Sequence, residues 1–174
     1  IANPEIVLTT SAIEVCEGGT VTFDAMAIDG GINQAVTWFV NGEMFANAGL
    51  ELTLNDITEL TSVYVQLETS APCPTNLFAF SDTIDVQVLV NITPTVTITG
   101  EETEFCNTED LNGTFTASTN FTPDSYIWFL NGTEEQNSSD NTFNLTNFGT
   151  GDVLSCRTIS EGNCLISTEA DSEE

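Results

Sequence analysis

The sequence predicts an all-β protein built from two tandem β-sandwich domains. Many short segments alternate apolar and polar residues with a period of two, which is typical of strands that bury one face. No stretch of the chain has a convincing helical period. The chain also repeats itself, and its 174 residues are enough for two small domains, because domains commonly hold about 100 to 150 residues and often fewer.

The repeat is clearest around the two tryptophans of the chain. Residues 37–42 (TWFVNG) recur as residues 127–132 (IWFLNG), so that Trp38 and Trp128 stand 90 positions apart. Later in the repeat the shift becomes 91. Small changes of this kind accumulate at loops when a domain is copied in tandem, so the sequence indicates two copies of one domain.

The repeat also predicts the domain boundaries. We expect the first domain at residues 4–93 and the second at residues 94–174. The second copy has no counterpart of the apolar segment 83–90, so we expect it to lack its last strand. Residues 1–3 correspond to residues 91–93, and we therefore expect them to be the tail of a preceding repeat in a longer tandem array.

Three strands are predicted in the first half of the first domain. Residues 5–10 alternate apolar and polar side chains directly after a proline. Residues 20–27 alternate between two Gly-Gly pairs, which are turn signals. Residues 35–40 alternate up to Asn41-Gly42, a dipeptide typical of a two-residue hairpin turn.

Three further strands are predicted in the second half of that domain. Residues 51–54 alternate leucines with polar residues, residues 62–69 alternate valines with polar residues, and residues 83–90 are rich in valine and isoleucine. Short strands at this spacing, separated by turn residues, predict an immunoglobulin-like sandwich of about seven strands in each copy.

Alternation also predicts which side chains form the core. In the second copy, Arg157 should point outward, because burying an unpaired arginine costs far more than burying a thiol. Leu154, Cys156 and Thr158 are then expected to point inward, around Trp128. The inward residues expected in the first copy are Val21, Phe23, Ala25, Val36, Trp38, Val40, Val63, Val65, Leu67, Ile84, Val86, Val88 and Val90.

The charge excludes several classes of function. Lys and Arg together number 1, Asp and Glu number 27 and His 0, which gives a formal net charge of -26. One arginine cannot form the basic patch that binds nucleic acid or an anionic membrane surface. Catalysis that needs histidine or lysine is excluded as well, and we expect no enzyme activity. No apolar run approaches the roughly 18 residues that span a bilayer.

Four of the five cysteines follow the repeat, and none forms a C-x-x-C motif. Cys16 aligns with Cys106 and Cys73 aligns with Cys164. We therefore predict one disulfide in each copy, Cys16 with Cys73 and Cys106 with Cys164, in an oxidising compartment outside the cytoplasm. Cys156 is expected to stay buried and reduced, and a wrong pairing with Cys164 is the alternative.

Two acidic clusters raise the question of a metal site. Neither has the spacing of an EF-hand loop, so we predict no specific metal site and no cofactor, apart from loosely bound calcium. The favoured interpretation of both is a solvated acidic loop. Weak calcium candidates in the first cluster are Glu101, Glu102, Glu104, Glu109 and Asp110, and the second cluster consists of Glu134, Glu135 and Asp140.

Two aromatic side chains are expected to point away from the core. Phe39 and Phe129 each follow a core tryptophan in the sequence, so alternation places them on the outer face of the sheet. Packing under a loop or between copies is the favoured interpretation. Contact with a ligand is the alternative.

Four landmarks occur in a fixed order along the chain. They are residues 16–23 (CEGGTVTF), residues 38–42 (WFVNG), residues 151–156 (GDVLSC) and Cys164. In this order they resemble the PKD/Ig-like tandem repeats of giant Bacteroidota surface proteins exported by the type IX secretion system, a group that includes SprB-like gliding-motility adhesins. The resemblance implies PKD-like sandwich domains at the cell surface, associated with the outer membrane.

The favoured functional hypothesis is a non-enzymatic stalk segment of a long extracellular adhesin that acts in gliding motility or surface adhesion. Its expected partners are neighbouring repeats, the gliding or secretion machinery and, through distal regions, a polysaccharide or substratum. No binding to nucleic acid and no insertion into a membrane is expected. The alternatives are a carbohydrate-binding or accessory module of a secreted enzyme, and a filament subunit completed by a strand from another chain.

Overall fold

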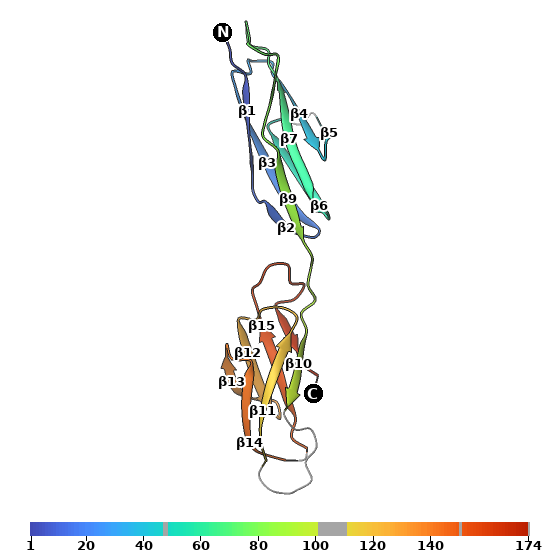
Figure 1. Ribbon diagram of the computed structural model, residues 1–174, viewed down its shortest axis with the longest axis vertical. Coiled ribbons are helices and arrows are strands. Elements are labelled where there is room, and N and C mark those ends of the chain that lie inside the picture. The colour runs from blue at the N-terminus through green and yellow to red at the C-terminus, as the bar shows by residue number, and fades with distance from the viewer. Residues whose placement is uncertain (47–48, 101–110, 150, 174) are drawn as a thin grey trace. The chain divides into compact units, whose positions relative to one another are not determined.

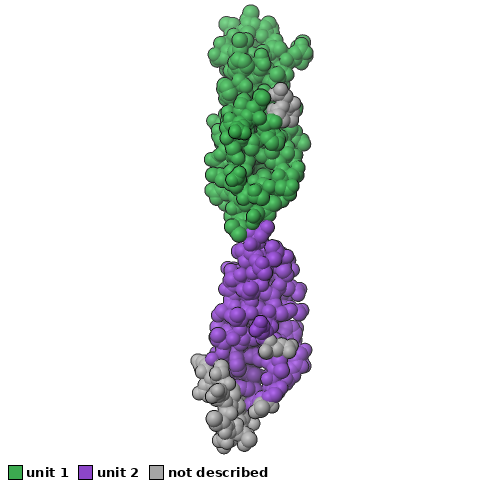
Figure 2. All heavy atoms as spheres, turned by 90° about the vertical axis from the view of Figure 1, so that its right-hand side faces the viewer, with its two compact units in different colours: residues 1–90 green, residues 91–174 purple. Residues whose placement is uncertain are grey.

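The computed structural model describes residues 1–46, 49–100, 111–149 and 151–173, and every regular element in these residues is a β-strand (Figure 1). The all-β class predicted from the sequence is therefore confirmed. The chain forms two compact units, residues 1–90 and residues 91–174 (Figure 2). The repeat boundaries inferred from the sequence, 4–93 and 94–174, stay a prediction.

Unit 1 is an immunoglobulin-like sandwich of two sheets. One sheet has the order β1-β3-β6, and the other has the order β2-β9-β7-β4-β5 with β8 beside β7. Two sheets that pack face to face bury one side of each strand, which is why the segments alternate. The strands are β1 (Glu5–Thr10), β2 (Glu14–Cys16), β3 (Gly19–Ile28), β4 (Ala35–Val40), β5 (Glu43–Ala46), β6 (Glu51–Ile57), β7 (Thr61–Glu68), β8 (Phe78–Phe80) and β9 (Ile84–Leu89).

The core of unit 1 lies between these sheets. Trp38 on β4 is fully buried, and so are Val65 on the neighbouring strand β7 and Phe23 on the opposite sheet. The alternation therefore predicted the buried face of the central strands. At the end of the domain it failed, because Val90 lies beyond the last residue of β9 and is 74% exposed.

Unit 2 repeats this arrangement, with fewer strands among its described residues. One sheet has the order β10-β11-β14 and the other the order β13-β12-β15-β16. The described residues of unit 2 contain no strand that corresponds to β9. The strands are β10 (Val96–Gly100), β11 (Leu111–Thr119), β12 (Ser125–Leu130), β13 (Thr133–Ser138), β14 (Thr142–Phe148), β15 (Leu154–Ile159) and β16 (Glu169–Asp171).

The core of unit 2 is centred on Trp128, which is fully buried and stacks on Phe143 with ring centroids 5.5 Å apart. Cys156 and Thr158 on β15 are buried, at 1% and 0% exposure, whereas the Arg157 side chain is 41% exposed. The outward position predicted for Arg157, and the inward positions predicted for its two neighbours, are therefore confirmed.

The hairpin turns of the two units have the same backbone conformation. Asn41 and Gly42 have φ of 52° and 82°, and Asn131 and Gly132 have φ of 52° and 78°. Two successive positive φ angles are the signature of a type I′ turn, whose twist matches that of the flanking strands. The Asn side chain adds a bond, because Asn41 Oδ1 accepts a hydrogen bond from the Ser62 amide at 2.9 Å.

Candidate functional site

The disulfide predicted in the first copy is not formed. Cys16 takes part in a disulfide, and so does Cys164, whereas Cys73 is exposed with a free thiol and Cys156 is buried with a free thiol. The predicted bond between Cys16 and Cys73 is therefore wrong. The predicted partner of Cys164, Cys106, lies outside the described residues.

The positions of the two cysteines in unit 1 explain this error. Cys16 ends β2 and pairs with Leu89 at the end of β9. Figure 1 shows β2 at the end of the unit away from the N-terminus. Cys73 lies at the N-terminal end, where its carbonyl accepts a hydrogen bond from the Ala2 amide at 3.3 Å. A disulfide needs Cα atoms within about 7 Å, and these residues occupy opposite ends of the sandwich.

The buried thiol in unit 2 has little reactivity. Burial raises the pKa of Cys156 to about 11, a backbone hydrogen bond from Ile127 opposes the shift, and the Asp171 carboxylate adds to it. The thiol therefore stays protonated at neutral pH, and a protonated thiol is a poor nucleophile. Its role is packing against the core, as in the equivalent position of unit 1, which is occupied by Val65.

The calcium candidates of the first acidic cluster lie where the structure gives no description, and those of the second cluster are exposed. Glu101, Glu102, Glu104, Glu109 and Asp110 all lie outside the described residues. Glu134 and Glu135 are exposed on β13, and Asp140 is exposed after it. Among the residues that the structure describes, no group of three or more His, Cys, Asp or Glu side chains is placed to hold a metal ion.

A pocket of about 530 Å³ lies along β10 in unit 2. It is lined by residues 94–98 together with Ala170, Asp171 and Glu173. Of its two carboxylates, Asp171 is already engaged by Arg157, as described below, which leaves Glu173 alone. Hydrolysis of a glycosidic bond commonly requires two carboxyl groups that both face the substrate. The pocket does not present such a pair.

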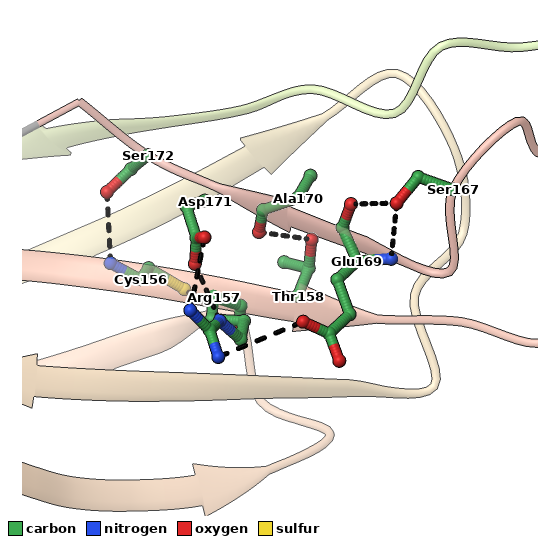
Figure 3. A network of polar contacts seen from close by, with 8 residues as sticks. All are labelled: Cys156, Arg157, Thr158, Ser167, Glu169, Ala170, Asp171 and Ser172. Carbon is green, nitrogen blue, oxygen red and sulfur yellow. Dashed lines mark hydrogen bonds and ion pairs between the residues drawn. The ribbon is translucent and has the colours of Figure 1, made fainter.

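The outer face of unit 2 carries an ionic network around Arg157 (Figure 3). Arg157 Nε donates to Asp171 Oδ1 at 2.7 Å, and its terminal nitrogen Nη2 donates to Asp171 Oδ2 at 3.2 Å. Glu169 Oε2 lies 3.8 Å from Arg157 Nη1. The guanidinium also lies 6.0 Å from the centre of the Phe129 ring, within reach of a cation–π contact. The network therefore attaches the short strand β16 to β15.

Two pKa values on this unit are shifted by local hydrogen bonds. The bidentate bond to Asp171 raises the pKa of Arg157 further above its ordinary value. Near the turn, Asn131 Nδ2 donates to Asp152 at 2.8 Å and the Gly149 amide donates at 3.0 Å. These two bonds lower the pKa of Asp152. Both groups are exposed, so the shifts describe local structure and no buried reactive charge.

The outer face of unit 1 is aromatic at the equivalent place. Phe39 on β4 lies opposite Tyr64 on β7, with ring centroids 4.7 Å apart and planes 3° from parallel. Phe80 on β8 follows at 6.5 Å from Tyr64 and is 59% exposed. On the other side of Phe39, its partner on β5 is Met44, which is 70% exposed. We call Met44, Phe39, Tyr64 and Phe80 the aromatic strip.

Part of this strip is predicted by the alternation of residues. The outward position predicted for Phe39 agrees with its partial exposure, and Phe129 is also partly exposed. Tyr64 and Phe80 were not identified as candidate binding residues. The signal for Tyr64 was present, since it alternates with the buried Val63 and Val65. Phe80 belongs to a three-residue strand that no periodicity could reveal.

Comparisons with known proteins identify no family. No protein-family model matches the sequence, and no curated protein matches it. In the part of the chain that the structure describes, no helix is of a length and apolarity that would cross a membrane.

Several solved structures match this chain in a comparison of backbone structure. The fibronectin(III)-like modules of Clostridium thermocellum CbhA share 12% identity with a TM-score of 0.42, over 95% of this chain and 92% of that chain. Murine CEACAM1b shares 11% with a TM-score of 0.42, over 97% and 96%. The human OSCAR ligand-binding domain shares 16% with a TM-score of 0.37, over 97% and 96%. At these scores the likeness carries no functional argument, and the fold rests on the strand order above.

Proposed function

We propose that this chain is a non-enzymatic structural segment of a long adhesin on the outer surface of the cell. The proposal rests on one observation: the two units share their core and turn structure and differ in the chemistry of their outer faces. They share the buried tryptophan, the type I′ turn and the pairing of the central strands. They do not share a polar site, because the outer face is aromatic in unit 1 and ionic in unit 2.

This pattern fits a domain that is copied for its shape. In tandem-repeat proteins each copy contributes length and stability, and its surface is free to diverge. An enzyme repeated twice would instead keep its reactive groups in both copies. In the pocket along β10, Asp171 is already paired with Arg157 and only Glu173 stays unpaired by it, which agrees with a structural role.

The charge supports an extended element outside the cell. Residues 1–90 hold 12 acidic side chains and residues 91–174 hold 15, against a single basic residue. Strong like charge keeps proteins soluble and opposes lateral association. The resemblance to PKD/Ig-like repeats supports an outer-membrane-associated adhesin, and we propose the gliding or secretion machinery and a substratum as partners of the whole protein.

The experiment is surface labelling of the source organism. Antibodies raised against residues 1–174 should label intact, unpermeabilised cells, and brief protease treatment should remove the label. Deletion of the encoded segment should reduce attachment of the cells to glass or polysaccharide films. Labelling that requires permeabilised cells would overturn the surface location, and normal attachment after deletion would overturn the adhesive role.

The complete gene separates this function from its alternative. Further copies of about 90 residues on the same chain support a stalk. A catalytic domain on the same chain would instead favour an accessory module of a secreted enzyme.

A further inference from the structure

The aromatic strip of unit 1 is not required by the fold. In unit 2 the positions equivalent to Tyr64 and Phe80 hold Ser155 and Asp171, with the same strand pairing around them. The sandwich therefore forms with polar residues at these places. Met44 and Phe80 at its ends are exposed, and Phe39 and Tyr64 between them are partly exposed. Such a strip on a chain this acidic needs another explanation, because contiguous apolar surface usually marks a binding site.

The strip has the dimensions of a site for an extended ligand. Its four residues lie on β5, β4, β7 and β8, and each pairs with the next across the sheet or lies beside it in a ring contact. The strip therefore crosses three strand spacings, which correspond to a length of about 14 Å. Gln66 lies beside Phe80 on the same face, and its amide both donates and accepts hydrogen bonds. The surface thus combines flat apolar rings with a neutral polar group.

Charge narrows the class of ligand. The four strip residues and Gln66 are all uncharged, whereas the whole chain carries a formal charge of -26. An anionic polymer is repelled by this field. A basic protein would be attracted to the acidic surface as a whole and has no reason to prefer an uncharged strip. A second copy of the chain is opposed by its own charge.

We propose that the aromatic strip binds an uncharged polysaccharide. Sugar rings have apolar C–H faces that pack against aromatic rings, and hydroxyl edges that hydrogen-bond to an amide such as that of Gln66. An uncharged chain of sugars is not repelled by the acidic protein as it approaches. The site goes beyond the proposed stalk function, since it gives one repeat a ligand of its own.

The test is native affinity electrophoresis of the whole chain in gels that contain soluble β-glucan, galactomannan or the anionic polysaccharide alginate. The wild-type chain should be retarded by at least one uncharged polysaccharide and not by alginate. Tyr64→Ser, which installs the residue of unit 2, and Phe80→Ser should each weaken the retardation at least tenfold. Binding to alginate alone, or no retardation in either uncharged gel, would overturn the proposal.

Matched control variants separate the strip from general apolar surface. Phe129→Ser changes the residue of unit 2 that is equivalent to Phe39. Leu77→Ser removes an apolar side chain that lies outside the strip and is 62% exposed. Both should bind like the wild type, and circular dichroism melts should show that all variants are folded. Equal losses in the controls would refute the assignment to the strip. The surface-labelling experiment does not depend on polysaccharide binding. The proposed stalk function and the proposed binding site can therefore be overturned independently.

Discussion

At the scale of single residues, the four described cysteines should react in three distinct ways. Iodoacetamide should label the exposed Cys73 within minutes in the native protein. Cys156 should react only after unfolding, because it is buried and its pKa is raised to about 11. Cys16 and Cys164 should react only after unfolding and reduction. Mass spectrometry of the labelled peptides measures this order, and native protection of Cys73 would contradict the structure.

The raised pKa of Cys156 also predicts a stability change at alkaline pH. The unfolded thiol ionises near its ordinary value of 9.0 and the folded thiol only near 11. As pH rises through this window the unfolded state loses its proton first, so the free energy of unfolding falls. By pH 10 the loss should be about 1 kcal/mol.

The variant Cys156→Val tests this prediction, because valine is the residue at the equivalent position of unit 1. At pH 7 it should change the free energy of unfolding by less than about 1.5 kcal/mol, since the swap nearly conserves volume. From pH 8 to pH 10 it should lose less stability than the wild type in urea titrations. Parallel pH curves for the two proteins would show that this thiol does not titrate as described.

Residue alternation predicts which face of a sheet a side chain occupies. It does not predict at which end of the sandwich that residue lies. It correctly placed Arg157 outward and Cys156 inward, because a one-residue change reverses the face. It could not place Cys16 and Cys73, which lie at opposite ends of unit 1. Distance along the sandwich depends on how strand pairs are staggered, and that information is not in the local sequence.

At the scale of elements, the Asn-Gly turns should be sensitive to the side chain of asparagine. Asn41→Ala places alanine at a φ of 52° and removes the bond to the Ser62 amide. We expect a loss of about 1–2 kcal/mol in the free energy of unfolding. Asn41→Gly keeps the backbone and should cost less. Urea unfolding measures both, and equal losses for the two variants would show that backbone strain is not the cause.

The attachment of β16 to β15 by Arg157 should be weak and sensitive to salt. Arg157→Gln installs the residue that occupies the equivalent position in unit 1, Gln66. Because the ion pair with Asp171 is exposed, its loss should lower the free energy of unfolding only slightly. In 1 M sodium chloride the difference from the wild type should shrink, since screening weakens the pair in the wild type. A loss that is unchanged by salt would point to packing of the arginine stem.

Six of the nine strands that the structure describes in unit 1 were predicted from the sequence, and the three that were missed share one property. β2 and β8 have three residues each and β5 has four, too few to establish a period of two. β2 exists because it pairs in parallel with β9, which lies far along the chain. Short strands of this kind are stabilised by their partners and leave little trace in their own sequence.

At the scale of the whole molecule, charge is the property that both units share most completely. Each unit carries at least 12 acidic residues, and the chain has one basic residue to balance them. Repulsion of this size destabilises any compact state and is relieved by salt or by acid.

The melting temperature should therefore rise with ionic strength. Increasing sodium chloride from 0.01 M to 0.5 M shortens the Debye length from about 30 Å to below 10 Å, which screens repulsion across each unit. Calcium chloride at equal ionic strength should give a similar rise if screening and loose binding are all that calcium supplies, and chelator should then have no further effect. A much larger rise at micromolar calcium, reversed by chelator, would establish a specific site and contradict the prediction that calcium is only loosely bound. The second acidic cluster is solvated, as predicted, but Glu134 and Glu135 lie on strand β13 and not in a loop. A melting temperature that does not respond to either salt would show that repulsion within each unit is not a significant cost to folding.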